Sequence, residues 1–388
     1  MNKRTFVAAA SAAACSLPVT AHATNGDQMM ALSAAQAAMG GATVAQARDA
    51  LAVMVNPAGI ADLGMKEVRM DLGFGLLNPP REVNGQESDS NWYMMPSGAV
   101  AFNVNDRLFL GMGMGGIAGM GVNVADAMAA AGNQPVVTTK QVLRFTPAAA
   151  FKVTDALTLG ASLNLVNQSL AMSLPGGGGN YVALPQNQQF GLGATVGATY
   201  KISPRWQAGL VYTTKTDVAR MEYNTPSGRT SFDMDMPASL ALGLSFKPMP
   251  GLQVEFDVKR YAFADVMKRI PVTNPPPGFP ATLNFGWKDQ TVYALGVKKD
   301  LGNKMAVSVG YNYGKSPFGA ESVNMNLGST AIVENHLSVG LTRKFSDKVS
   351  GTFAYTHAFS NELTSSVAPY NKIEIHQNQY NFNVSYQF

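Results

Sequence analysis

The chain ends in QYNFNVSYQF, residues 379–388, and this stretch decides the fold. Apolar or aromatic residues occupy the even positions from Tyr380 to Phe388, and uncharged polar residues occupy the odd positions. Alternation with a period of two predicts a β-strand with one apolar and one polar face. Such a strand fits a soluble β-sandwich, where one face packs on the core and the other contacts water. It also fits a membrane barrel, where the apolar face contacts lipid and the polar face lines a water-filled lumen.

The N-terminal residues indicate that the protein leaves the cytoplasm. Two basic residues precede a short apolar run and then the small-x-small triplet AHA at 21–23. This pattern is typical of a secretory signal peptide, so we expect residues 1–23 to be removed. The single cysteine, Cys15, lies in that segment, and the mature chain needs no disulfide. A lipoprotein anchor at Cys15 is an alternative, although the usual upstream leucine is missing.

The composition favours a membrane barrel. Charged residues make up 14% of the chain, glycine contributes 38 residues, and the net charge is +4. Beyond residue 23 there is no uninterrupted apolar run long enough for a transmembrane helix. Alternating strands can cross a membrane without such a run. The small net charge gives no reason to expect nucleic acid as a partner.

Turn signals recur at an interval of about 50 residues, and pairs of strand-like runs lie between them. The two runs of a pair are joined by a longer segment rich in Gly, Pro, Asn and Ser, such as SLPGGGGNYVALPQNQ at 173–188. Short turns at one end and long loops at the other are typical of an outer-membrane barrel, whereas a soluble sandwich does not need this rhythm. Six turns and two chain ends predict fourteen antiparallel strands within residues 65–388. Their expected starts are near residues 66, 91, 106, 139, 155, 188, 205, 230, 251, 288, 303, 331, 348 and 372.

Residues 24–64 precede the first expected strand and do not alternate. Their Ala, Met and Gln content favours short helices, with Asp27 as an N-cap and Gly40-Gly41 as a break. A segment of about 40 residues is too short for a core of its own. We therefore expect it to fold into the lumen as a mostly helical hatch that plugs the barrel. A mobile periplasmic extension is the alternative.

Several blocks of the sequence occur in a characteristic order along the chain. They include Asn56-Pro57-Ala58-Gly59, FTPAAAFKVTDALTLGASLN from 145, LGATVGATYKISPRWQAGLVYTTK from 192, HLSVGLTRKFSDKVSGTFAYTHAF from 336, and the aromatic terminal strand. In this position and followed by these blocks, the NPA triplet is specific. Together the blocks resemble the FadL-type family of outer-membrane transporters for long-chain fatty acids and other hydrophobic compounds.

The resemblance implies a 14-stranded antiparallel transmembrane β-barrel in the bacterial outer membrane, with the hatch in its lumen. It also implies passive transport, without a cofactor or a chemical step. The ligand, a fatty acid or a hydrocarbon, would be captured by apolar extracellular loops and released sideways into outer-membrane lipid at a kinked third strand. In such proteins the terminal strand, here ending at Phe388, is also read by the barrel assembly machinery. A general diffusion porin and a structural or adhesive barrel are the alternatives.

The third strand supplies the candidate exit and capture residues. Glycine weakens strand pairing and permits bulges, although glycines can also simply make room for the hatch. We expect a kink and a lateral exit at Gly111, Gly113, Gly115 and Gly116. Methionine is flexible and polarizable, which suits ligands of varied shape. The expected capture residues are Met112, Met114, Ile117, Met120, Val122 and Met128.

Charged residues on the lumen face are the remaining candidates. A basic residue at the membrane midplane on the lipid face costs about 2–4 kcal/mol, so alternation assigns Arg144, Glu255, Asp257 and Lys259 to the lumen. Their mixed signs indicate pairing with one another or with the hatch, but Arg144 could instead hold a ligand carboxylate. The four histidines lack the spacing of metal ligands, and no nucleophile elbow occurs. We expect neither a metal site nor catalysis.

Overall fold

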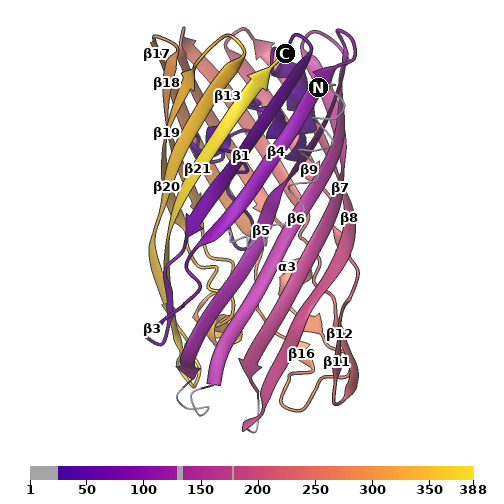
Figure 1. Ribbon diagram of the computed structural model, residues 1–388, viewed down its shortest axis with the longest axis vertical. Helices are drawn as coiled ribbons and strands as arrows, with labels where there is room; N and C mark the ends of the chain where they lie inside the picture. Colours follow the sequence, from indigo (N-terminus) through magenta and orange to yellow (C-terminus); the bar gives the residue numbers. More distant parts are fainter. Residues whose placement is uncertain (1–24, 129–133, 177–178) are drawn as a thin grey trace, which may run out of the picture.

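The protein forms a closed antiparallel β-barrel (Figure 1). The computed structural model describes residues 25–128, 134–176 and 179–388. Strand β1 pairs with both β4 and β21, which closes the sheet. The wall has the fourteen strands that the sequence predicts: β1 (Val68–Asn78), β4 (Tyr93–Asn103), β5 (Leu108–Met128), β6 (Gln134–Lys152), β7 (Leu157–Pro175), β8 (Tyr181–Ser203), β9 (Trp206–Thr213), β13 (Ser239–Met249), β14 (Leu252–Tyr261), β17 (Gln290–Gly302), β18 (Met305–Gly314), β19 (Asn335–Lys344), β20 (Val349–Thr364) and β21 (Lys372–Gln387).

Strand β21 closes the barrel as its alternation predicts. Its register against β1 places Phe382 opposite Phe74, and the two rings stack with centroids 5.1 Å apart. Phe382 and Val384 are exposed on the outer surface, whereas Asn381 and Asn383 are buried in the lumen. An apolar outside and a polar inside indicate a wall that faces lipid.

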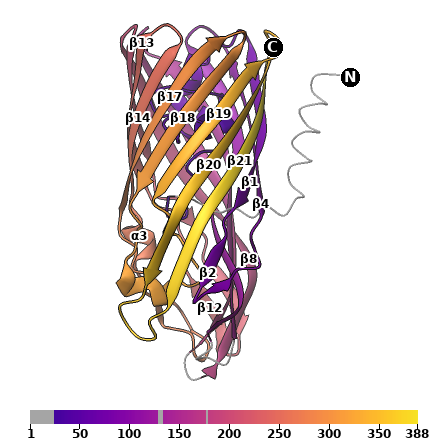
Figure 2. The same cartoon turned by 90° about the vertical axis from the view of Figure 1, so that its left-hand side faces the viewer.

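The two ends of the barrel differ (Figures 1 and 2). Short turns join the strands at the end that carries Phe388, and outer-membrane barrels keep such turns in the periplasm. At the opposite, extracellular end, β5 to β8 extend furthest. Among the described residues, no helix is long and apolar enough to span a membrane. The small elements of the extracellular loops are β2 (Arg81–Val83), β3 (Gln86–Glu87), β10 (Asp217–Val218), β11 (Met221–Thr225), β12 (Gly228–Phe232), α3 (Ala264–Met267), β15 (Ile270–Pro271), β16 (Thr282–Leu283) and η5 (Ala320–Met325).

Most strands begin within a few residues of their predicted positions, and the eighth strand is the main error. The sequence predicts its start near residue 230, but β13 begins at Ser239. Residues 228–232 have the composition of a strand because they form β12, which pairs with β11 in an extracellular hairpin. Local pattern cannot distinguish a strand of the wall from a strand of a loop.

Residues 25–64, the hatch, lie inside the periplasmic half of the barrel and are drawn in indigo in Figure 1. The hatch contains three short helices joined by non-helical chain. They are α2 (Ala34–Ala37), η1 (Ala50–Met54) and η2 (Pro57–Asp62). Their N-caps are Ser33, Asp49 and Asn56, whose side chains each accept a hydrogen bond from a backbone N–H of the first turn.

The predicted chain break at Gly40-Gly41 is confirmed, because both residues adopt positive φ angles of 63° and 78° after α2. The prediction that Asp27 caps a helix is wrong. No helix follows Asp27 directly, and its carboxylate instead forms an ion pair with Lys140 of β6 at 2.8 Å. Both side chains of this pair are buried, so the first described residues of the hatch are tied to the wall.

The hatch backbone lies directly against glycines of the wall. A Cβ atom on Gly310 of β18 would lie 2.0 Å from the Gly40 nitrogen, and one on Gly160 of β7 would lie 2.2 Å from the Ala58 nitrogen. Both distances are far below van der Waals contact. The hatch backbone therefore occupies the space that a side chain at either position would need.

Candidate functional site

An apolar cavity of about 310 Å³ lies at the extracellular end of the barrel. Strands β5 to β8 form one side of it, and extracellular loops around Phe279, Leu283 and Leu327 form the other. Its lining includes Met120 and Met172, and none of its described lining residues is charged. We call it the outer cavity. Its walls suit a hydrophobic molecule, because a charged one would lose its hydration without gaining a partner.

A β-bulge in β5 decides which of its side chains face this cavity. The register against β6 shifts between Gly116 and Ala118, which places one extra residue in β5. An extra residue reverses the face on which the following side chains lie. Before the bulge, Met112 is 43% exposed on the outer surface, whereas after it Met120 is buried and lines the outer cavity.

The six predicted capture residues are therefore divided. Met112 and Met114 precede the bulge and do not line either lumen cavity described here. Met120 lines the outer cavity and Val122 is buried in the same apolar cluster. Ile117 lines a second cavity, described below. Met128 ends β5, but its side chain lies outside the described part of the structure.

The wall has a window between β4 and β5. These strands pair only as far as Ser97 and Gly115, although β4 continues to pair with β1 as far as Tyr93. The next residue of β4 along this edge is Pro96, which has no N–H to donate. Wall contact resumes at Asn123, whose carbonyl accepts a hydrogen bond from the Asp89 nitrogen at 2.8 Å.

The start of the hatch occupies this window. The Met29 nitrogen donates to the Ile117 carbonyl at 2.8 Å, and the Gly119 nitrogen donates to the Asp27 carbonyl at 3.0 Å. These bonds pair two backbone groups of β5, the Ile117 carbonyl and the Gly119 nitrogen, in the stretch that β4 leaves unpaired. The Met29 side chain packs with Tyr93 and Met95 on the inner side of β4. The start of the hatch therefore pairs with β5 in place of β4, and the Met29 side chain fills the window with an apolar group.

The four predicted exit glycines have two different environments. A Cβ on Gly113 would lie 2.6 Å from the Val53 Cγ2 of the hatch, and one on Gly111 would lie 2.8 Å from the Val53 Cγ1. These two make room for the hatch. Gly115 is the last residue paired with β4, and Gly116 immediately precedes the bulge. Only the second pair borders the window.

The tetrapeptide Asn56-Pro57-Ala58-Gly59 holds the hatch in place. The Asn56 side-chain amide donates to the Val44 carbonyl at 2.8 Å and to the Ala198 carbonyl of β8 at 3.2 Å. Its oxygen caps η2, and Pro57 occupies the first turn, where its missing N–H costs nothing. A Cβ atom on Gly59 would lie 3.1 Å from the Ala47 Cβ, so glycine allows close packing within the hatch. The contacts of the tetrapeptide therefore join parts of the hatch to one another and join the hatch to the wall.

All four predicted lumen charges contact the hatch, and three of them lie on β14. Glu255 forms an ion pair with Arg48. Asp257 accepts hydrogen bonds from the Thr43 and Val44 nitrogens at 2.8 and 3.0 Å. Lys259 donates to the Gly41 carbonyl at 2.6 Å. These residues of β14 form one polar side of the socket in which the hatch sits.

The hatch itself also contains a hydrogen-bonded carboxylate, that of Asp49. Asp49 accepts hydrogen bonds from the side chains of Ser33 and Gln36, the latter at 3.1 Å. Burial raises the pKa of Asp49 to about 6, and the neighbouring Asp71 carboxylate adds to the rise. Asp71 accepts a hydrogen bond from the Ala50 nitrogen at 2.8 Å, so two carboxylates meet at the start of η1.

Arg144 lines a smaller cavity between hatch and wall, of about 130 Å³. Its Nη2 donates to the Met54 carbonyl at 2.5 Å, and its buried Nε has no protein partner. Lys259 and Tyr261 also line this inner cavity, together with apolar residues that include Met29 and Ile117. The last two are residues of the window, so the inner cavity adjoins it.

The sequence analysis missed the ion pair of Asp27 with Lys140, and it missed Met29, whose side chain fills the window. Lys140 has the same parity as Arg144, and this alternation could have assigned it to the lumen. No local signal marks Asp27 or Met29, because their partners are distant in the chain. Among the described residues, no group of three or more His, Cys, Asp or Glu side chains is placed to hold a metal ion.

Comparison with protein families identifies a match over most of the chain. The family model described as "Outer membrane protein transport protein (OMPP1/FadL/TodX)" matches residues 9–387. No curated protein sequence matches the chain.

Three solved structures illustrate the similarity in fold. The Pseudomonas putida toluene transporter TodX has a TM-score of 0.79 at 20% identity, with 94% of this chain and 100% of that chain covered. The Ralstonia pickettii toluene transporter TbuX has a TM-score of 0.72 at 21% identity, with 92% and 99% covered. A Pseudomonas aeruginosa FadL homologue has a TM-score of 0.76 at 14% identity, with 94% and 100% covered.

Proposed function

Because the chain belongs to the OMPP1/FadL/TodX family of outer membrane transport proteins, we propose that it carries small hydrophobic molecules passively across the bacterial outer membrane. Residues 1–23 would be its signal peptide, 24–64 its hatch and 65–388 its barrel. The family is one of transporters, and the proposal needs no chemical step or cofactor.

The outer cavity is the observation that carries this proposal. It has a volume of about 310 Å³, and its described lining is uncharged and mostly apolar, with flexible methionines among the aliphatic residues. Such a surface can adapt to molecules of different shape. Of the predicted capture residues, Met120 and Val122 support this role.

We propose that the ligand leaves sideways through the window, into the lipid. A polar path through the lumen would require a hydrophobic molecule to enter water, whereas a window between β4 and β5 opens onto the membrane. Met29 and the backbone of Asp27 would have to withdraw from β5 first. Gly115 and Gly116 would serve this exit, and Gly111 and Gly113 would serve the hatch.

The inner cavity bears on the substrate class. A neutral hydrocarbon such as toluene, named for two of the structural relatives, needs only the apolar walls. A fatty acid would also need a partner for its carboxylate, and Arg144 with its free Nε, beside Lys259, offers one. Replacing Arg144 with Met distinguishes these two substrate classes. The substitution should weaken uptake of a fatty acid and leave uptake of toluene unchanged.

A disulfide between hatch and window tests lateral release. Gln28 and Ala118 are bridge partners, so their Cα atoms are close enough for a disulfide, and the chain from residue 24 on contains no cysteine. In cells without another transporter, oxidised Gln28→Cys/Ala118→Cys protein should lose uptake of radiolabelled toluene or oleate, and a reductant should restore it.

The matched control is a cross-strand disulfide elsewhere on the wall. Val309 and Val339 are partners on β18 and β19 and are both exposed on the outer surface. Val309→Cys/Val339→Cys protein should transport normally in both redox states. Normal uptake by the oxidised hatch disulfide would mean that the ligand does not pass the window.

A general diffusion porin and a structural barrel are the competing functions. An open pore would not need a hatch that fills the space beside Gly160 and Gly310. Deleting residues 24–64 separates the cases, because a plugged transporter should become leaky to ions while a porin should keep its conductance. A structural barrel would give no ligand-dependent result in any of these assays.

A further inference from the structure

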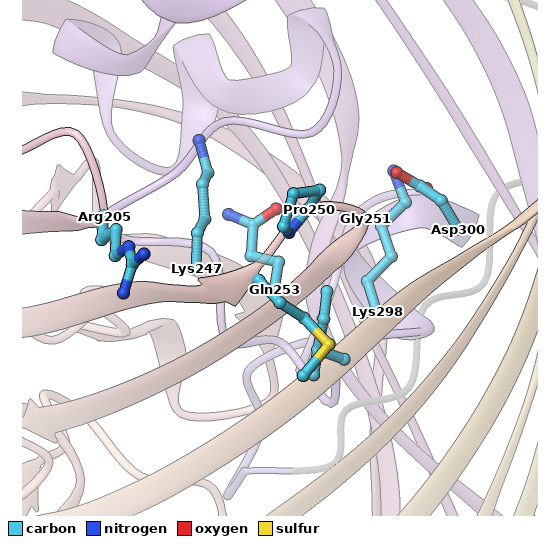
Figure 3. A pocket seen from close by; sticks show the side chains of 9 residues that line it. Arg205, Lys247, Pro250, Gly251, Gln253, Lys298 and Asp300 are labelled. Atoms are coloured by element: carbon cyan, nitrogen blue, oxygen red, sulfur yellow. The ribbon is translucent and has the colours of Figure 1, made fainter.

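A third cavity, of about 340 Å³, lies at the periplasmic end of the barrel, away from the outer cavity and the window (Figure 3). It is formed by the turn between β8 and β9, the turn between β13 and β14, and the last residues of β17. Figure 3 shows the Lys247, Gln253 and Lys298 side chains pointing to one side of the wall, and Arg205 on the neighbouring turn with its side chain pointing away from that of Lys247 in this view. We call it the periplasmic cavity.

Backbone hydrogen bonds hold its three elements together. The Lys247 nitrogen donates to the Arg205 carbonyl at 2.9 Å, and the Asp300 nitrogen donates to the Gly251 carbonyl at 2.7 Å. The charged side chains therefore project from fixed positions on the rim of the barrel. A site assembled from such positions does not need a loop to become ordered when a ligand binds.

The charge in the cavity is mainly positive. Arg205, Lys247 and Lys298 line it, and Asp300 is the single carboxylate among its described lining residues. Asp300 lies 3.8 Å from the Lys298 amine, and within the described ranges neither Arg205 nor Lys247 forms an ion pair. The nearby lumen acid Glu255 is already paired with Arg48. Two cations are thus free to meet an anion.

The rest of the lining indicates what kind of anion fits. Met249 and Leu252 add an apolar part to the wall, and the volume exceeds what a small inorganic ion fills. On the outer surface beside this rim, Trp206 stacks on Phe246 with centroids 4.1 Å apart. Aromatic pairs of this kind mark the boundary between lipid tails and headgroups. The periplasmic cavity therefore lies near the headgroup level of the inner leaflet.

We propose that the periplasmic cavity binds a phosphate group attached to a larger organic part, with Arg205, Lys247 and Lys298 as its ligands. A guanidinium can bind two phosphate oxygens at once, and two ammonium groups can serve the remaining charge. The phosphate can come from the headgroup of an anionic phospholipid or from a soluble phosphate ester. This site is independent of the proposed transport of hydrophobic molecules.

The experiment compares both sources on the complete mature protein. In one arm, protein in nanodiscs that mix phosphatidylglycerol with phosphatidylcholine is analysed for lipids that remain bound after transfer to detergent. In the other arm, glycerol 3-phosphate and inorganic phosphate are titrated at low ionic strength by calorimetry. The test variants are Lys247→Gln and Arg205→Gln. The matched control is Lys299→Gln, on the outward side of β17 next to Lys298.

We expect wild-type protein and Lys299→Gln to retain phosphatidylglycerol or bind glycerol 3-phosphate, and each test variant to bind about tenfold more weakly. Lipid retention without binding of the soluble ester assigns the site to a headgroup, and the reverse assigns it to a soluble ester. Absence of binding in both arms overturns the proposal, as does equal binding by Lys247→Gln and wild type. Resistance of the barrel to denaturation in cold detergent shows that the variants are folded.

Discussion

Removing the Asp257 carboxylate should release the hatch from the wall while the barrel stays intact. Asp257 is buried, and one of its oxygens accepts hydrogen bonds from the Thr43 and Val44 nitrogens at 2.8 and 3.0 Å. In Asp257→Ala both N–H groups lose their acceptor. The Lys259 amine, 3.6 Å from the same carboxylate, also loses its counter-charge.

The expected size of the effect comes from the two hydrogen bonds. A buried donor without an acceptor costs about 1–3 kcal/mol, so the pair costs about 2–6 kcal/mol of docking free energy. Since about 1.4 kcal/mol is a factor of ten, the population of undocked hatch should rise at least about 30-fold. Asp257→Asn keeps an oxygen acceptor and should have a smaller effect.

Hydrogen exchange of the Met29 and Ala50 amides measures this population, because both donate to the wall and keep their acceptors in Asp257→Ala. Single-channel recordings in planar bilayers should show a new ion leak. The control is Asp347→Ala, because the Asp347 side chain is fully exposed in a periplasmic turn. If these two amides exchange in Asp257→Ala within twofold of the wild-type rate, the carboxylate does not hold the hatch and the hydrogen-bond reasoning is wrong.

Three further changes test other parts of the structure. Gly310→Ala should force Gly40 of the hatch away from β18 at a cost of about 1–3 kcal/mol, which an ion leak in bilayers would reveal; a tight channel would contradict the close fit. Lys140→Met leaves a buried carboxylate unpaired, so protection of the first hatch amides from exchange should fall by about 3–5 kcal/mol, and unchanged protection would refute the buried pair. Met120→Ser should weaken ligand uptake by about 5- to 30-fold in apparent affinity, whereas Met112→Ser, on the outer surface of the same strand, should not; equal effects would remove the outer cavity from the path.

The wall of the barrel could be predicted from the sequence because each strand carries its own signal. Alternation, short turns and long loops are local properties, and they determine the number of strands and the closure of β21 on β1. The start of β13 could not be found in this way, since the hairpin of β11 and β12 has a similar local pattern.

The site was less predictable, because its decisive contacts join distant parts of the chain. Whether Met112 or Met120 faces the lumen depends on the bulge after Gly116, and a glycine-rich run does not say where the extra residue lies. The pairing of Asp27 with Lys140 crosses more than a hundred residues and needs the closed barrel to exist. Composition identified the third strand as important but could not assign roles within it.

The close fit of the hatch to the wall constrains how the protein folds. The hatch precedes the strands of the wall along the chain, yet Asp257 and Gly310, which receive it, lie on β14 and β18, more than 200 residues further along. Such non-local contacts form slowly, since long loops must close before any of them is gained. The hatch can therefore take its final position only once β14 and β18 are in place.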